Sequence, residues 1–245
     1  MPRSACEPER PEPSPYYYSE CLEARRLDLC AIDGALLEVE RAWPRIDAEL
    51  ARLYIGRKDP FTSLLRANML SAYAYLDSLL ATSVAPFSPA GLDHMLALNE
   101  RVHYGTDAAL IAEFNSAIES NAEKFNAQIE PIANWYWKHV GRGDHPCKLA
   151  AETYVSIVGQ PQLFIEGNHR TGSLIASWIN LAAGYPPFVL SVDNAVDYFA
   201  PSAAIKQFAN RSTWRGRQQL PKYRKSFRAF WEQHVDDKYV RTIHG

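Results

Sequence analysis

A helix–loop–helix pattern around residue 165 constrains the fold of this chain more than any other part of the sequence. Residues 146 to about 160 begin with a proline and carry apolar side chains at helical spacing. Residues 174–183 repeat this spacing and stop at Gly184. Proline at the start of a helix and glycine after its end are the usual boundary signals. The sequence therefore predicts two core helices joined by a short loop that lies within the stretch 162–173.

Most of the remaining chain also has helical periodicity. Apolar side chains recur every three or four residues from Cys21 to about Gly56, and again after Pro60. This spacing is typical of helices with one face in a core. Because Pro44 interrupts the first segment, we expect one helix before it and a second helix that it opens. Residues 107–138 contain no alternating strand pair and are predicted to be helical, so the predicted fold class is all-α.

Length and composition predict one helical domain with a short tail. The chain has 245 residues, enough to bury a sizeable core, and its net charge of -2 indicates no particular partner. Residues 1–18 contain five prolines and are expected to be disordered, although Tyr16-Tyr17-Tyr18 is suited to docking this tail on the domain. The helical domain is then predicted to cover residues 19–245.

Cysteine usage and hydropathy indicate a cytoplasmic protein. The four cysteines lack metal-ligand spacing, so we expect reduced thiols rather than a disulfide framework. The sequence has neither a basic-then-apolar leader nor a run of about 18 apolar residues, so no signal peptide or membrane span is predicted. Secretion into a host cell by a route without a visible signal stays open.

The central loop is a candidate anion site. It ends in Gly167-Asn168, where the next helix is expected to begin, and a helix start leaves backbone N–H groups unsatisfied in a region of positive potential. His169 and Arg170 stand at the same helix start, where cations are normally unfavourable. An anion bound between the loop and Arg170 would compensate, so we predict a phosphate-bearing small molecule as the ligand.

This loop resembles the active loop of the Fic (Fido) family, which reads His-x-Phe-x-(Asp/Glu)-Gly-Asn-Gly-Arg-x-x-Arg between two helices of an all-α fold. The matching residues are Phe164, Glu166, Gly167, Asn168 and Arg170. Three positions differ. Gln162 replaces the catalytic histidine, His169 replaces the second glycine, and Ser173 replaces the last arginine. The flanking residues His145-Pro146 and Gly184-Tyr185-Pro186 also resemble those of the family.

The resemblance implies a Fic-like helical bundle that binds ATP or another nucleotide together with Mg²⁺. Glu166 would hold the metal with the nucleotide phosphates, which is the usual arrangement for Mg²⁺. The phosphates would contact Gly167, Asn168, His169, Arg170 and Thr171. Because a neutral amide is no base near pH 7, Gln162 cannot replace a histidine, and losing a general base typically slows a reaction about a hundred- to ten-thousandfold. AMP transfer to a hydroxyl is therefore expected to be lost or altered, as in a pseudoenzyme.

Two alternatives stay open at the loop. His169 is the other candidate for a base, and with it the protein would be an active nucleotidyl- or phosphotransferase acting on a hydroxyl, including one on a protein target. The loop residues also have purely structural interpretations: Phe164 as a core anchor, Gly167-Asn168 as a tight turn, and Glu166 as a solvated or helix-capping acid.

The basic region 206–228 gives a third hypothesis, a nucleic-acid or protein-binding module. No acidic residue lies between Phe199 and Trp231, whereas eight lysines and arginines do. Such density attracts polyanions, and the interleaved aromatic residues suit stacking on bases. The alternative is a solvated helix face whose aromatic side chains point inward and whose charges pair with acids elsewhere, and the balanced net charge favours it.

Overall fold

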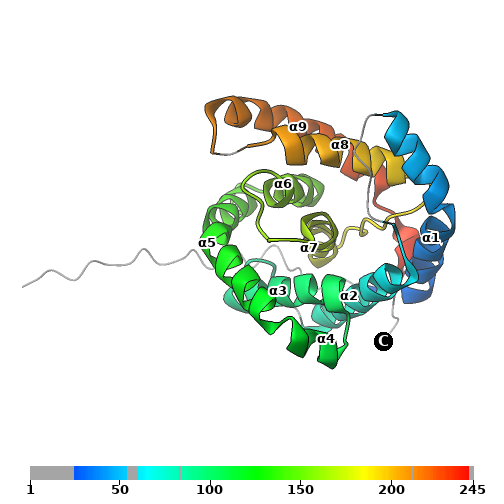
Figure 1. Cartoon of the computed structure of the whole chain (residues 1–245). Helices are drawn as coiled ribbons and strands as arrows, with labels where there is room; N and C mark the ends of the chain where they lie inside the picture. Colours follow the sequence, from blue (N-terminus) through cyan, green and yellow to red (C-terminus); the bar gives the residue numbers. More distant parts are fainter. Residues whose placement is uncertain (1–24, 54–59, 83, 211, 243–245) are drawn as a thin grey trace, which may run out of the picture.

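The computed structural model describes residues 25–53, 60–82, 84–210 and 212–242. Within these residues the protein consists of nine α-helices and one two-stranded sheet, so the all-α prediction is confirmed (Figure 1). The predicted tail of residues 1–18 and the docking of its tyrosines lie outside the described residues. Of the cysteines that are described, Cys30 is exposed, Cys147 is buried, and both are free thiols.

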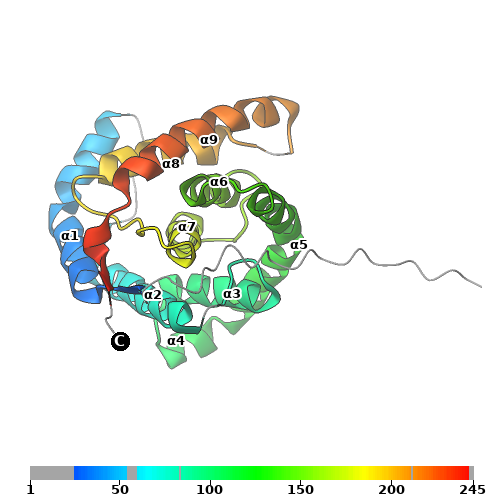
Figure 2. The ribbon, with the colours of Figure 1, turned by 180° about the vertical axis from the view of Figure 1, so that it is seen from behind.

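The elements follow one another along the chain in a simple order. They are β1 (Arg25–Leu27), α1 (Leu29–Arg52), α2 (Ser63–Thr82), α3 (Pro89–Tyr104), α4 (Ala108–Glu113), α5 (Asn115–Val140), α6 (Pro146–Val158), α7 (Asn168–Ala182), α8 (Ala195–Phe208), α9 (Trp214–His234) and β2 (Val240–Thr242). Helix α7 lies in the centre, and the other helices surround it in both views (Figures 1 and 2).

Helix α7 is the core of the fold. Every residue from Thr171 to Leu181 is buried, which identifies a helix enclosed on all sides. It packs most extensively against α6. The two helices approach closely at Gly172, where a Cβ atom would lie 3.2 Å from the ring of Tyr154. The helix–loop–helix prediction is confirmed, with both helices in the interior.

Helix α1 corrects the prediction at Pro44. We expected this proline to open a second helix, but it lies inside one continuous helix, Leu29–Arg52. An interior proline removes one backbone hydrogen bond and costs about 3 kcal/mol. The buried stripe continues past it through Trp43, Ile46 and Leu50, and this packing outweighs the loss. The predicted helix end near Gly56 lies outside the described residues.

A short antiparallel sheet replaces the helix that we expected over residues 25–27. In β1 and β2, Arg25 pairs with Thr242 and Leu27 with Val240. Helix α1 begins only after Asp28, whose carboxylate accepts a hydrogen bond from the N–H of Ala31 at 3.0 Å. This prediction was wrong because the cap and the pairing with distant residues override a weak helical pattern.

Residues 107–138 are almost entirely helical, as predicted, because α4 and α5 cover them and are separated only by Phe114. The buried apolar side chains form one cluster that extends from Leu27 to Tyr239. Among the described residues, no helix combines the length and the apolar character that crossing a membrane requires.

Candidate functional site

The loop between α6 and α7 is anchored by Phe164, as its interpretation as a core residue predicted. Phe164 is fully buried and stacks on Phe125 of α5, with ring centroids 5.4 Å apart. The N–H of the preceding residue, Leu163, donates to the carbonyl of Ile157 at 3.1 Å. These contacts fix where the loop leaves the end of α6.

Asn168 closes the loop on itself. Its Oδ1 accepts a hydrogen bond from the N–H of Phe164 at 2.8 Å, and its Nδ2 donates to the carbonyl of Phe164 at 2.9 Å. Asn168 is buried, so these bonds form out of water. The side chain of Asn168 thus holds the loop, and contact with a phosphate through its backbone N–H stays a prediction.

Asn99 of α3 supports the same loop from outside. Its Nδ2 donates to the carbonyl of Glu166 at 3.1 Å and to the hydroxyl of Thr171 at 2.9 Å. The side chain of Asn99 is buried, and its Oδ1 accepts a hydrogen bond from Asn121 of α5 at 2.9 Å. Thr171, which was predicted to contact phosphate, is fully buried. Its hydroxyl accepts the hydrogen bond from Asn99 and so connects α3 to the start of α7.

Helix α5 adds two further supports. Oδ1 of Asn121 accepts from the N–H of Ile165 at 2.8 Å, and Nζ of Lys124 donates to the carbonyl of Phe164 at 2.7 Å. Burial lowers the pKa of Lys124. The sequence analysis missed Asn99, Asn121 and Lys124. The only feature of the sequence that could have identified these three residues is that each is polar and lies on a helix face that otherwise packs inward.

Gly167 directly precedes α7 and has a conformation that requires glycine. Its φ of +73° is left-handed, and a Cβ atom there would lie 2.5 Å from Nε2 of His103. His103, at the end of α3, was not recognised as a site residue from the sequence. Burial and the nearby charge of Arg170 lower the pKa of His103, and Glu166 opposes this only in part. No side chain caps the start of α7 by a hydrogen bond.

A pocket of about 480 Å³ opens beside this helix start. Gln162, Glu166, His169 and Arg170 line it on the loop side, together with Gly167 and Asn168. The opposite wall is largely apolar, with side chains from α1, the segment before α2, α2 itself and α8. They are Leu36, Trp43, Phe61, Leu65, Met69, Tyr73 and Phe199. Lys206 of α8 also lines the pocket. The volume is within the range of small-molecule sites.

Arg170 lies between the start of α7 and the end of α3. Its Nη1 donates to the carbonyl of Val102 at 2.7 Å, and its side chain is half-buried. The carbonyl end of α3 is the negative end of that helix dipole, so it offsets part of the cation's unfavourable position. The carbonyl of Val102 therefore compensates the charge of Arg170 at this helix start, and a bound anion is not required for that.

His169 belongs to a buried hydrogen-bonded group rather than to the loop surface alone. Its Nδ1 lies 2.9 Å from the hydroxyl of Tyr154, and its carbonyl accepts from the hydroxyl of Tyr198 at 2.9 Å. The hydroxyl of Tyr154 also contacts Ser202 at 2.7 Å. Burial raises the pKa of Tyr154 and of Tyr198, so both phenols stay protonated. These contacts account for His169 without a catalytic role.

The two remaining loop residues differ in their contacts. Nε2 of Gln162 donates to the carbonyl of Val158 at 3.3 Å, so it satisfies a backbone group at the end of α6. Glu166 is exposed at the pocket. Among the described residues there is no group of three or more histidine, cysteine or acidic side chains that is arranged to hold a metal ion. Glu166 by itself offers the single carboxylate that Mg²⁺ needs when phosphates complete its shell.

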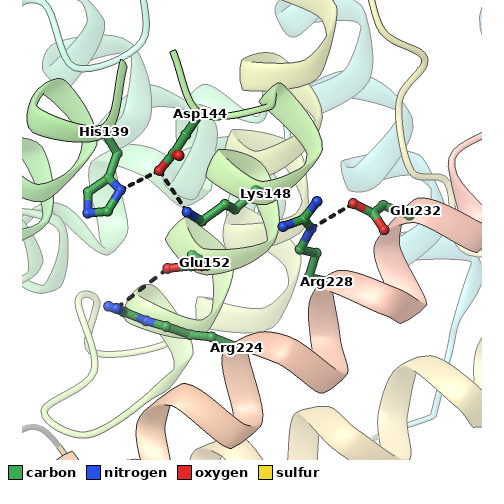
Figure 3. A network of polar contacts seen from close by, with 7 residues as sticks. All are labelled: His139, Asp144, Lys148, Glu152, Arg224, Arg228 and Glu232. Atoms are coloured by element: carbon green, nitrogen blue, oxygen red, sulfur yellow. Dashed lines mark hydrogen bonds and ion pairs between the residues drawn. The ribbon is translucent and has the colours of Figure 1, made fainter. Parts of the chain in front are cut away.

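Two arginines of the basic region form ion pairs with acidic residues. Arg224 of α9 lies 3.5 Å from Glu152 of α6, and Arg228 lies 2.7 Å from Glu232. Figure 3 shows both pairs near a third group, in which Asp144 contacts His139 and Lys148. The side chains of Phe227 and Phe230 are buried in the core. For these residues the structure agrees with the alternative of an inward-facing helix.

The sequence matches no protein-family model, and the structure matches no solved structure. The likeness to the Fic family therefore depends on the loop motif and its flanking residues, and what it implies for function is a proposal.

Proposed function

We propose that this protein binds a phosphate-bearing small molecule in the pocket at the start of α7. The observation that carries the proposal is that one cavity of about 480 Å³ joins an uncapped helix start and two cationic side chains to an apolar wall. A ligand with one anionic end and one apolar or ring-shaped end fits this division. A nucleotide is such a ligand.

The phosphate end belongs at the loop. Backbone N–H groups at the start of α7 and the positive end of its dipole favour an anion there. Arg170 and Lys206 add two cations along the same cavity. A guanidinium can give two parallel hydrogen bonds to a phosphate, which makes Arg170 the stronger contributor.

The other end of the ligand belongs against α1 and α2. Trp43 lies with its ring centroid 5.9 Å from that of Phe61 and 5.7 Å from that of Phe199. All three line the cavity with Met69. Aromatic side chains there offer stacking and apolar contact to a base or another planar group.

Magnesium fits the proposal through Glu166. When a nucleotide is bound, a Mg²⁺ ion supplies charge neutralisation on its phosphates, and an exposed carboxylate at the cavity is a suitable oxygen ligand. We propose that Glu166 has this role, in line with the loop's resemblance to the Fic family.

We further propose that AMP transfer is lost or altered. In a Fic site a histidine would take the proton from the attacking hydroxyl, and Gln162 has no comparable proton affinity. The position of the last arginine is occupied by Ser173, whose hydroxyl donates to the carbonyl of Arg170 at 2.8 Å. Ligand binding without efficient transfer is the activity that these residues support best.

Isothermal titration with ATP, ADP and GTP, each with and without Mg²⁺, tests the binding proposal. We expect at least one to bind, and Lys206→Ala to weaken binding about ten- to a hundredfold, because a hydrogen bond to a charged group contributes roughly 1.5–3 kcal/mol. Lys138→Ala is the matched control, since Lys138 of α5 is also exposed but does not line the cavity. Absence of binding by all three nucleotides, with an unchanged melting temperature, would refute the proposal.

Restoring the histidine tests the second part. We expect Gln162→His to transfer label from α-labelled ATP to itself or to an added protein, while the unaltered protein stays unlabelled. Label on the unaltered protein that Glu166→Ala abolishes would show instead that the protein is an active transferase. A silent Gln162→His variant that still binds ATP would mean that the loop does not support AMP transfer.

A further inference from the structure

Helix α9 carries exposed basic side chains that form no ion pair with an acidic residue in the described part of the chain. Arg215, Arg217, Lys222 and Lys225 are all exposed, and none forms an ion pair with another residue of the described chain. We call these four residues the basic face. They differ from Arg224 of the same helix, which is half-buried, is paired with Glu152 and lies over the ring of Trp135.

The basic face is combined with large exposed aromatic side chains. Trp214 is 65 % exposed at the start of α9, and Phe208 is 49 % exposed at the end of α8. Trp214, Lys222 and Lys225 lie on the same side of α9, because their spacings of eight and three residues return to one helix face. They span about 16 Å along the axis at 1.5 Å per residue.

The turn before α9 keeps Phe208 close to this face. A Cβ atom at Gly216 would lie 2.1 Å from the carbonyl oxygen of Asn210, so the glycine lets the chain after α8 pass directly over the first turn of α9. The hydroxyl of Thr213 caps the helix by accepting from the N–H of Gly216 at 3.1 Å. Phe208, two residues before Asn210, thus lies close in the chain to this contact with the first turn of α9.

Charge is strongly segregated between this region and the rest of the chain. Residues 198–231 contain eight of the 26 lysines and arginines and none of the 28 aspartates and glutamates, so the rest of the chain carries ten more acidic than basic side chains. A small net charge therefore conceals a local positive field. Such a field attracts a polyanion and accelerates its encounter.

We propose that the basic face and Trp214 form a binding surface for single-stranded nucleic acid. Phosphates of the strand contact the basic side chains, and unpaired bases stack on the exposed aromatic ring. A duplex hides the faces of its bases, and an acidic peptide has none, so exposed tryptophan among unpaired cations favours a single strand. This surface is separate from the pocket beside α7, because none of its residues lines that pocket.

Fluorescence anisotropy with a labelled 20-nucleotide single strand of mixed sequence tests the proposal on the full chain. Each phosphate contact contributes about -0.7 to the slope of log K against log salt, so three contacts give a slope of about -2 and a roughly fifteenfold loss between 50 and 200 mM salt. The triple variant Arg215→Glu, Lys222→Glu, Lys225→Glu should abolish binding.

The matched control is Arg41→Glu, Arg45→Glu, Arg52→Glu on α1. These arginines are also exposed, and the variant makes the same change in net charge, but acidic residues lie between them. It should bind like the unaltered protein. Equal loss in both triple variants, with both still folded by circular dichroism, would show that only net charge matters and would overturn the proposal.

Replacing Trp214 separates stacking from charge. Trp214→Ala should weaken binding roughly five- to a hundredfold with an unchanged salt slope, and Trp214→Phe should retain most of the affinity. Two results would overturn the proposal: a duplex of the same length that binds as tightly as the single strand while Trp214→Ala has no effect, or polyglutamate that displaces the strand at equal charge concentration.

Discussion

The guanidinium of Arg170 donates a 2.7 Å hydrogen bond to the carbonyl of Val102, which joins the start of α7 to the end of α3. This contact brings the arginine of the loop close enough to His103 to affect its protonation. It also means that Arg170 is oriented by the protein before any ligand binds. A preoriented arginine loses less side-chain freedom when it contacts a phosphate.

Replacing Arg170 should therefore raise the pKa of His103. Burial and the positive charge of Arg170 both lower this pKa, and Arg170→Met removes only the second cause, so the pKa should rise but stay below its value in a solvent-exposed histidine. NMR titration of the imidazole protons measures the change, and the His103→Gln variant identifies the resonance. An unchanged pKa in Arg170→Met would show that burial alone sets it.

Asn168 should matter for stability even without a ligand. Asn168→Ala removes both hydrogen bonds to the backbone of Phe164. The buried N–H of Phe164 then has no acceptor, and the carbonyl of Phe164 loses one of its donors. We expect a decrease of about 2–4 kcal/mol in the free energy of unfolding. Urea denaturation measures it. The control Asn115→Ala removes an exposed side-chain bond and should change stability by about 0.5 kcal/mol or less. Equal effects of the two variants would contradict the role given to Asn168.

Two neighbouring arginines of β1 allow a direct comparison of buried and exposed ion pairs. Asp77 is buried and accepts hydrogen bonds from Arg26 at 2.8 Å and from the N–H of Leu27 at 2.7 Å. Asp77→Ala should lower the free energy of unfolding by about 3–5 kcal/mol, because it leaves these donors without an acceptor. Asp237→Ala removes the exposed partner of Arg25 and should cost less than about 1 kcal/mol. Similar losses, measured by urea denaturation, would show that burial does not distinguish the pairs.

Asp144 should make stability depend on pH in acid. Burial raises its pKa, but hydrogen bonds from Lys148 and His139 outweigh burial, so the folded pKa is below the unfolded value (Figure 3). The unfolded chain then binds the proton more tightly, and the stabilisation is present above about pH 4 and is lost as pH falls through the folded pKa. The difference in unfolding free energy between the protein and Asp144→Asn should thus be largest above about pH 4 and shrink on acidification. A difference that is constant from pH 6 to pH 2.5 would contradict this assignment.

The central part of the fold could be predicted because its signals are local. Pro146, the apolar spacing after it and Gly184 define α6, the loop and α7 within a short stretch of sequence. The helix boundary predicted at Pro44 was wrong for the opposite reason, because the packing that stabilises the helix around Pro44 involves helices elsewhere in the chain. Local rules describe one segment at a time, and tertiary contacts can override them.

The candidate site was only partly predictable for the same reason. Gln162, Glu166 and Arg170 line the pocket as neighbours in the motif, and the motif could be read directly. Asn99 reaches Glu166 across 67 positions of sequence, and Asn121 reaches Ile165 across 44. Nothing in the sequence near these asparagines indicates which distant backbone group they contact. The role of His169 in a buried group of tyrosines likewise depends on α6 and α8.

The pairing of β1 with β2 has a practical consequence for engineering the chain. Arg25 and Thr242 are partners across the sheet, so the two ends of the described fold lie side by side. A few glycines between them should close the backbone into a ring, and new ends can be opened at the exposed turn Gly141-Arg142-Gly143. In such a rearranged chain, α6 and α7 would be the first helices to leave the ribosome rather than the sixth and seventh.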